Sequence, residues 1–189
     1  MTRLAVFASG NGSNAQRIIE YFSSHPSVTV DLVLCNKPDA FVITRAEQLG
    51  VSIRVFDKAT FYGTSEIPDF LIENRINYLI LAGFLWLIPE NLLSAYPGRI
   101  INIHPALLPK YGGKGMYGMK VHEAVIAARE PESGITIHFV DENYDEGRII
   151  FQAKCQVDAG ETPESLAEKI HALEYSYFAG VVEGIVTGD

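Results

Sequence analysis

The chain has 189 residues, of which 48% are hydrophobic and 20% charged, and its formal net charge is -8. This composition excludes a disordered chain and predicts a single globular domain over residues 1–189. The acidic balance, without runs of Lys or Arg, argues against a protein that grips nucleic-acid backbones.

The first half of the chain alternates apolar, β-rich runs with helical patterns. Strands are expected at 4–8, 28–35, 52–56 and 78–82, and helices at 15–22, 41–49 and 67–74. The strand at 78–82 is apolar on both faces, which is typical of the centre of a sheet covered on two sides. This order predicts an α/β fold with a doubly wound, mostly parallel sheet and right-handed crossovers.

The second half departs from this alternation. A short helix at 89–96, a strand at 99–104 and a helix at 120–129 precede strands at 135–140 and 148–157 and a long helix at 164–182. The last two strands lie about ten residues apart, too close for a helical crossover, so we expect an antiparallel or divergent pair.

Membrane, metal and disulfide signals are weak. No run approaches the ~18 apolar residues of a membrane span, and no signal peptide is visible, so a cytoplasmic protein is expected. The two cysteines, Cys35 and Cys155, lie in predicted strands and are expected to be buried, free thiols. No Cys/His spacing suggests zinc, so no metal is expected.

The most informative segment is 100–113, which holds Asn102, His104 and Pro105. Spacing by two residues puts Asn102 and His104 on one face of a strand, and proline ends the strand there. Ligands bind at that edge of an open α/β sheet. An amide beside an imidazole suggests a site that polarises a carbonyl and moves a proton, although two satisfied polar residues at a strand end are equally compatible with the spacing.

Two further loops are candidates. Residues 9–14, Ser-Gly-Asn-Gly-Ser-Asn, connect the first strand to the first helix, where exposed N–H groups favour a single phosphate. An ordinary glycine turn capped by Ser13 or Asn14 is the alternative. The acidic loop 141–147 follows a strand that carries Thr136 and His138; it could orient an imidazole or be plain solvated surface.

The segment 83–89 is apolar and follows a central strand, so it either packs in the core or lines a pocket for a flat ligand. His25, His122 and His171 carry no local signal.

Four sequence blocks occur in order along the chain: residues 9–14, Leu-Ala-Gly-Phe at 81–84, Asn-x-His-Pro-x-Leu-Leu-Pro at 102–109, and His-Phe-Val at 138–140 followed by Asp-Glu-Gly at 145–147. Together they resemble the phosphoribosylglycinamide formyltransferase family. The resemblance covers residues 4 to about 180. It implies a Rossmann-like formyltransferase fold, and transfer of a formyl group from 10-formyltetrahydrofolate to the amine of 5-phosphoribosylglycinamide, a step of purine synthesis. The implied partners are small molecules, for a monomer or homodimer.

The resemblance also implies the site residues. The catalytic trio would be Asn102, His104 and Asp145, with Thr136 and His138 lining the site behind it. The ribonucleotide would be bound by Gly12, Ser13, Asn14 and Glu174. The folate would be bound by Leu85, Trp86, Leu87, Ile88, Val140 and Asp141.

These residue types suit formyl transfer. As the amine attacks the formyl carbon, the Asn102 amide and a protonated His104 would stabilise the formyl oxygen, with Asp145 keeping His104 charged. Three features depart from the family: Trp86 replaces a commonly basic residue, the loop 112–119 is long and glycine-rich like a mobile flap, and a C-terminal extension is missing.

The alternatives are related enzymes or a binding module. A formyltetrahydrofolate deformylase would use the same trio with water, but the first strand at residue 4 leaves no N-terminal regulatory domain. A methionyl-tRNA formyltransferase is disfavoured by the charge and by the missing RNA-binding domain. A non-catalytic phosphosugar or folate-binding module would not need Asn102, His104 and Asp145 together.

Overall fold

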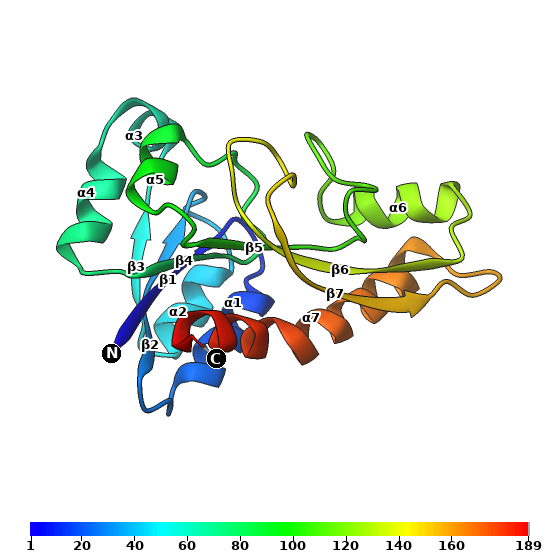
Figure 1. Ribbon diagram of the computed structural model, residues 1–189, viewed down its shortest axis with the longest axis horizontal. Coiled ribbons are helices and arrows are strands. Elements are labelled where there is room, and N and C mark those ends of the chain that lie inside the picture. The colour runs from blue at the N-terminus through cyan, green and yellow to red at the C-terminus, as the bar shows by residue number, and fades with distance from the viewer. Residues whose placement is uncertain (189) are drawn as a thin grey trace.

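The computed structural model describes residues 1–188, and its backbone is a seven-stranded sheet (Figure 1). The strands are β1 (Thr2–Ala8), β2 (Val28–Cys35), β3 (Ser52–Val55), β4 (Tyr78–Leu81), β5 (Ile100–His104), β6 (Glu132–Phe139) and β7 (Ile149–Gln156). They lie in the order β3-β2-β1-β4-β5-β6-β7, parallel up to β5 and antiparallel from β5 to β7. The predicted doubly wound, mostly parallel α/β sheet with its antiparallel pair is confirmed.

The helices agree with the predicted ones except in two places. They are α1 (Ser13–Phe22), α2 (Val42–Gln48), α3 (Lys58–Gly63), α4 (Glu66–Glu73), α5 (Glu90–Ala95), α6 (Met119–Ala127) and α7 (Pro163–Thr187). Helix α3 was not expected, because six residues are too few to show a helical period; the Asp57 side chain caps it by accepting from the Thr60 N–H. Helix α7 continues past the predicted end at 182.

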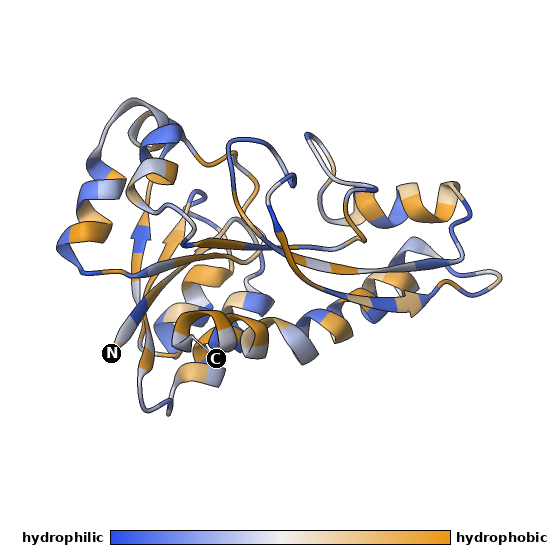
Figure 2. Cartoon of the chain, in the orientation of Figure 1, coloured by the Kyte–Doolittle hydropathy of each residue, from blue (hydrophilic) through white to orange (hydrophobic). Residues whose placement is uncertain are grey.

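Each face of the sheet has its own apolar core. Helices α1, α2 and α7 bury side chains against one face, and α3, α4 and α5 cover the other face at the β1–β4 side. The alternation along the strands produces this division: Leu4 and Val6 belong to the first core and Ala5 and Phe7 to the second. Figure 2 shows the apolar residues concentrated along the central strands.

The polar residues of β5 and β6 share the face opposite α7. Ile101 and Ile103 join the core beneath α7, so Asn102 and His104 point the other way. In the antiparallel register, Asn102 lies opposite His138 and His104 opposite Thr136. Loops 105–118 and 140–148 rise over this face near β5 (Figure 1). A polar patch on the sheet is therefore covered by loops instead of a helix.

The chain switches direction across the sheet between β1 and β4, which are neighbours although about seventy residues of chain separate them. The loops that follow the two strands are tied together: the Ser9 N–H donates to the Gly83 carbonyl, and the Leu85 N–H donates to Ser9 Oγ, at 3.1 and 3.0 Å. Such a switch point is where open α/β sheets bind ligands.

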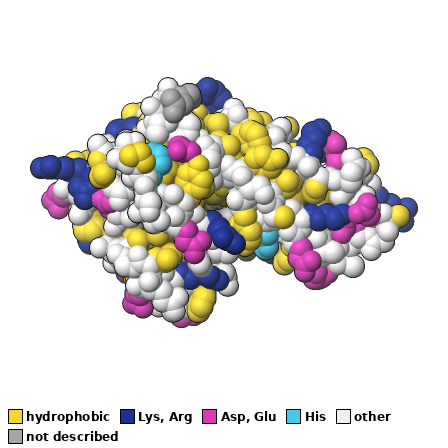
Figure 3. Space-filling model, turned by 90° about the horizontal axis from the view of Figure 1, so that it is seen from below, with side chains coloured by type: hydrophobic (Ala, Val, Ile, Leu, Met, Phe, Trp, Pro, Cys, Tyr) yellow, Lys and Arg dark blue, Asp and Glu magenta, His cyan; other side chains and the backbone are white. Residues whose placement is uncertain are grey.

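The face of the molecule seen from below carries both charges: basic and acidic side chains are scattered over it, with apolar side chains gathered in patches between them (Figure 3). No helix within residues 1–188 is long and apolar enough to cross a membrane. Both cysteines are free thiols, as predicted; Cys35 is buried as expected, whereas Cys155 is only half-buried.

Candidate active site

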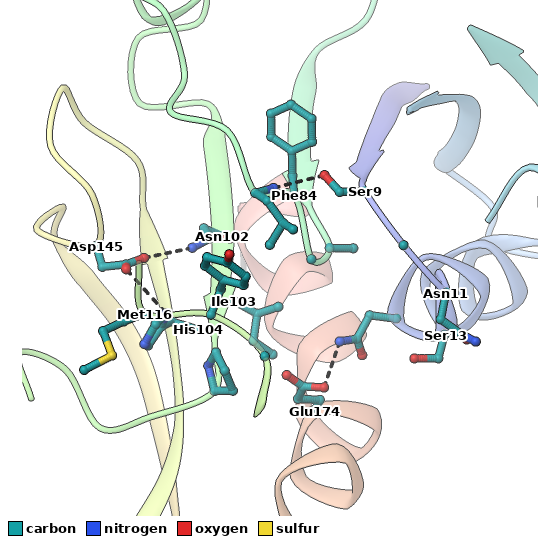
Figure 4. Close-up of a pocket in the computed structure, with 18 of the residues that line it drawn as sticks. Ser9, Asn11, Ser13, Phe84, Asn102, Ile103, His104, Met116, Asp145 and Glu174 are labelled. Atoms are coloured by element: carbon teal, nitrogen blue, oxygen red, sulfur yellow. Dashed lines mark hydrogen bonds and ion pairs between the residues drawn. The ribbon is translucent and has the colours of Figure 1, made fainter. Parts of the chain in front are cut away.

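The main candidate site is a cavity of about 650 Å³ at the carboxyl ends of β1, β4 and β5 (Figure 4). This size is typical of a small-molecule site. Its wall combines the loops after these strands with α6 and α7. The lining residues predicted from the sequence are Gly12, Ser13, Asn14, Leu85, Asn102, His104, Asp145 and Glu174. Residues about 160 positions apart in the chain thus meet around one space.

One end of the cavity is the N-terminus of α1. Gly12 precedes the helix with φ 78°, and no side chain within residues 1–188 caps the helix there. A Cβ on Gly12 would lie 2.4 Å from Val42 Cγ2, so only glycine fits. The first-turn N–H groups therefore remain available, and an uncapped helix N-terminus favours an anion. The alternative of a helix capped by the Ser13 or Asn14 side chain is not what the structure has.

Glu174 of α7 is tied to this end. Asn14 Nδ2 donates to Glu174 Oε2 at 2.9 Å, although the two residues are 160 positions apart (Figure 4). Glu174 is only 6% exposed, and this burial raises the pKa of its carboxyl, against the opposing effects of Asn14 and His171. The α7 helix thus places a buried acid beside the helix N-terminus.

Asn102, His104 and Asp145 converge at the other end. His104 Nδ1 lies 3.4 Å from Asp145 Oδ2, and Asn102 Nδ2 donates to Asp145 Oδ1, also at 3.4 Å (Figure 4). Asp145 Oδ2 also accepts from the Gly113 N–H at 3.0 Å. Asp145 has φ 57°, an uncommon left-handed conformation for a residue other than glycine. The acidic loop is therefore shaped to aim one carboxylate at the imidazole.

His138 and Thr136 lie behind the trio and support it. His138 Nδ1 donates to the Phe139 carbonyl at 2.8 Å, so its Nε2 accepts from Asn102 Nδ2 at 3.0 Å. Thr136 is fully buried; its hydroxyl donates to the Ala106 carbonyl and accepts from the Leu108 N–H. His138 thus orients the Asn102 amide, and Thr136 holds the loop that follows β5.

His104 is buried, whereas Asn102 and Asp145 are half-buried, and burial acts on the protonation of the imidazole and the carboxyl. Burial lowers the pKa of the His104 imidazole; Asp145 and the Tyr111 carbonyl, which accepts from Nε2 at 2.8 Å, raise it, but not enough to compensate. Burial would raise the pKa of the Asp145 carboxyl, yet His138, His104 and the Gly113 N–H hold it below its usual value. Burial therefore opposes the expectation that Asp145 keeps His104 protonated: the pKa of His104 lies below its usual value, which favours the neutral ring at neutral pH, while Asp145 stays ionised.

The predicted folate residues are divided among three hollows. Only Leu85 lines the main cavity. Trp86 packs against an aromatic cluster of Phe56, Phe61, Tyr62 and Phe84, beside a separate surface hollow. Another cavity of about 770 Å³ is lined by the remaining four, Leu87, Ile88, Val140 and Asp141. Because the loops 85–88 and 140–145 run along both cavities, these two spaces are neighbours.

Three cavity residues were missed by the sequence: Lys37, His122 and His171. His171 lies three positions before Glu174, which on a helix means the same face, so this spacing could have indicated it. Lys37 follows β2 and His122 lies on α6, and neither position carries a local pattern. The loop 112–119 also reaches the cavity, since Gly113 to Gly118 line it. Within residues 1–188, no three His, Cys, Asp or Glu side chains are grouped as metal ligands would be.

Comparison with known proteins assigns the family. Residues 2–182 match the formyl transferase family model. A chloroplastic phosphoribosylglycinamide formyltransferase of Arabidopsis thaliana is 45% identical over 97% of this chain, which spans only 65% of that relative's length. The Bacillus subtilis phosphoribosylglycinamide formyltransferase is 36% identical, over 98% of this chain and 95% of its own. The crystal structure of the Streptococcus pneumoniae TIGR4 phosphoribosylglycinamide formyltransferase superposes with a TM-score of 0.86 at 37% identity, covering 98% of this chain and 99% of that one. The chain belongs to the formyl transferase family.

Proposed function

We propose that this protein transfers a formyl group from 10-formyltetrahydrofolate to the amine of 5-phosphoribosylglycinamide. The observation that carries the proposal is the composition of one cavity, which has an amide, an imidazole and a carboxylate at one end and an uncapped helix N-terminus at the other. A substrate with an anionic phosphate at one end and a nucleophilic amine at the other matches this polarity. The names of the relatives agree with it.

In the proposed reaction, the substrate amine attacks the formyl carbon and a C–N bond forms. The formyl oxygen gains negative charge, the bond to the folate nitrogen then breaks, and the proton lost by the amine balances the proton gained by that nitrogen. Asn102 supplies an amide N–H for the oxygen, because its 3.4 Å contact with Asp145 is long and readily exchanged.

His104 handles the proton in this proposal. In its neutral form the ring donates its Nε2–H to the Tyr111 carbonyl, which leaves Nδ1, 3.4 Å from Asp145 Oδ2, to take a proton. A proton taken from the amine creates an imidazolium that the carbonyl and the carboxylate both stabilise. The ionised Asp145 raises the pKa of His104, so it stabilises the imidazolium once the proton has been taken.

The folate is proposed to occupy the cavity of Leu87, Ile88, Val140 and Asp141 with its pterin. Because Leu85 and Asp145, on the same two loops, line the main cavity, a pterin bound there directs its formyl group toward the trio. Trp86 would act through the packing of this loop and not through a charge. A cytoplasmic location, a single domain, the absence of a metal and a monomeric or homodimeric state stay predictions.

The test is folate turnover measured with and without 5-phosphoribosylglycinamide. Transfer predicts turnover that needs the amine and yields one formylated ribonucleotide for each folate consumed. Turnover that is equally fast without the amine would refute transfer in favour of deformylation, and binding without turnover would favour the non-catalytic module. The variant His104→Ala should lower turnover by at least about a hundredfold while circular dichroism shows a folded chain.

A further inference from the structure

His122 lines the main cavity but has no role in the reaction described above. It lies on α6, is 2% exposed, and its Nδ1 has no hydrogen-bond partner within residues 1–188. Burial lowers the pKa of His122 to about 4, with further lowering by His171 and His104, so the ring is neutral. His122 lines the same cavity as His104 of the trio and as His171 and Glu174 of α7. A buried polar atom without a partner is costly and uncommon, which points to a ligand that completes it.

A second atom of the same cavity shares this condition. Asn14 Oδ1 is also buried and has no partner among the described residues, because the Asn14 amide group is engaged through Nδ2 with Glu174. The section of the cavity between the trio and the helix N-terminus therefore offers a neutral imidazole, an amide oxygen and a buried carboxyl. None of these groups attracts an anion. Hydroxyl groups suit all three, since each hydroxyl can donate and accept.

We propose that His122 positions the ribose of the substrate through a hydrogen bond between its Nδ1 and a sugar hydroxyl. The proposal rests on the proposed function, in which the ribose lies between the amine at the trio and the phosphate at α1. His122 is then a positioning and specificity residue: it aligns the sugar so that the amine reaches the formyl carbon, and it rejects analogues that lack the hydroxyl. An unpaired polar atom makes such rejection effective.

The experiment compares the ribonucleotide with its 2′-deoxy and 3′-deoxy analogues in the wild type, His122→Leu and His122→Asn. Loss of one neutral hydrogen bond is expected to raise KM for the ribonucleotide roughly tenfold in His122→Leu. KM for the analogue that lacks the contacting hydroxyl should hardly change, because it never made that bond. Asparagine places an amide atom near the position of Nδ1, so His122→Asn should recover most of the discrimination. KM for the folate should stay the same in both variants.

The outcomes separate the possible roles. If His122→Leu weakens all three nucleotides equally, or changes none, then Nδ1 is satisfied by water or serves packing, and the proposal is overturned. If His122→Leu does not fold, His122→Gln replaces it: its amide reaches the Nε2 position, so it should lose the discrimination, and retaining it would overturn the proposal. A wild type that transfers no formyl group to the ribonucleotide contradicts the proposed function itself.

Discussion

Gly12→Ala tests the inference that the N-terminus of α1 is built as an anion site. Gly12 has φ 78°, and an added Cβ would meet Val42 Cγ2, Cβ and Cα at 2.4, 2.5 and 2.8 Å. The left-handed backbone costs an alanine about 1–2 kcal/mol, and overpacking adds about 1–3 kcal/mol. The last contact is to backbone, so shortening the Val42 side chain would not remove it.

The expected loss is the sum of these terms, about 2–5 kcal/mol, which for a chain of this length lowers Tm by roughly 5–20 °C. The helix N-terminus must also move away from α2, so KM for the ribonucleotide should rise at least about tenfold while KM for the folate stays the same. Differential scanning calorimetry and initial-rate kinetics measure the two effects.

Gly50→Ala is the matched control. Gly50 also has a positive φ, 70°, but an added Cβ there meets nothing within 4 Å, so it carries the backbone cost without the collision. Gly12→Ala should therefore lower Tm clearly more than Gly50→Ala does, and only Gly12→Ala should change KM. Equal losses of Tm with an unchanged KM for the ribonucleotide would refute the reasoning.

Three further predictions concern the support of the trio, the buried imidazole and the folate loop. Thr136→Val leaves the Leu108 N–H unpaired and should lower the free energy of unfolding in urea by about 1–3 kcal/mol. Thr29→Val is the control, because the Thr29 hydroxyl makes no hydrogen bond within residues 1–188, and it should lower that free energy little. A similar loss in both variants would contradict the prediction. The pKa of His122 falls from 6.5 to about 4 on folding, so the neutral ring contributes about 3 kcal/mol to the free energy of unfolding above pH 6.5, and this contribution is lost as the pH falls toward 4. His122→Asn should therefore make the free energy of unfolding less dependent on pH between 6.5 and 4. An unchanged slope would argue against a buried neutral His122. Trp86 is the only tryptophan, and it lies in sequence between Leu85, which lines the main cavity, and Leu87, which lines the neighbouring one. Folate binding should therefore change the tryptophan fluorescence in a saturable way. An unchanged signal at folate concentrations that saturate turnover would show that this loop does not contact the folate.

The sheet was predictable because its signals are local. The apolar run at 78–82 marked a central strand, and β4 lies between β1 and β5. The close spacing of the last two strands indicated antiparallel pairing, which β6 and β7 have. Helix α3 was missed because a single short turn capped by Asp57 shows no period.

The site was predictable in part. Spacing by two residues and a following proline correctly put Asn102 and His104 on one face at the end of β5. Their partner Asp145 could be named only through the family resemblance, because an acidic loop looks the same whether it faces water or an imidazole.

Thus the sequence by itself determined the α/β class, the strand-end pair Asn102 and His104, and the glycine turn at Gly12, since each depends on neighbours within a few residues. The tertiary structure decided what those residues meet. It brought His122 from α6 into the same cavity as these residues, it divided the residues predicted to bind folate among separate hollows, and it buried His104, which lowers the pKa of the ring. The physical reason is that desolvation and long-range contacts depend on how distant segments pack, and no local pattern records that packing.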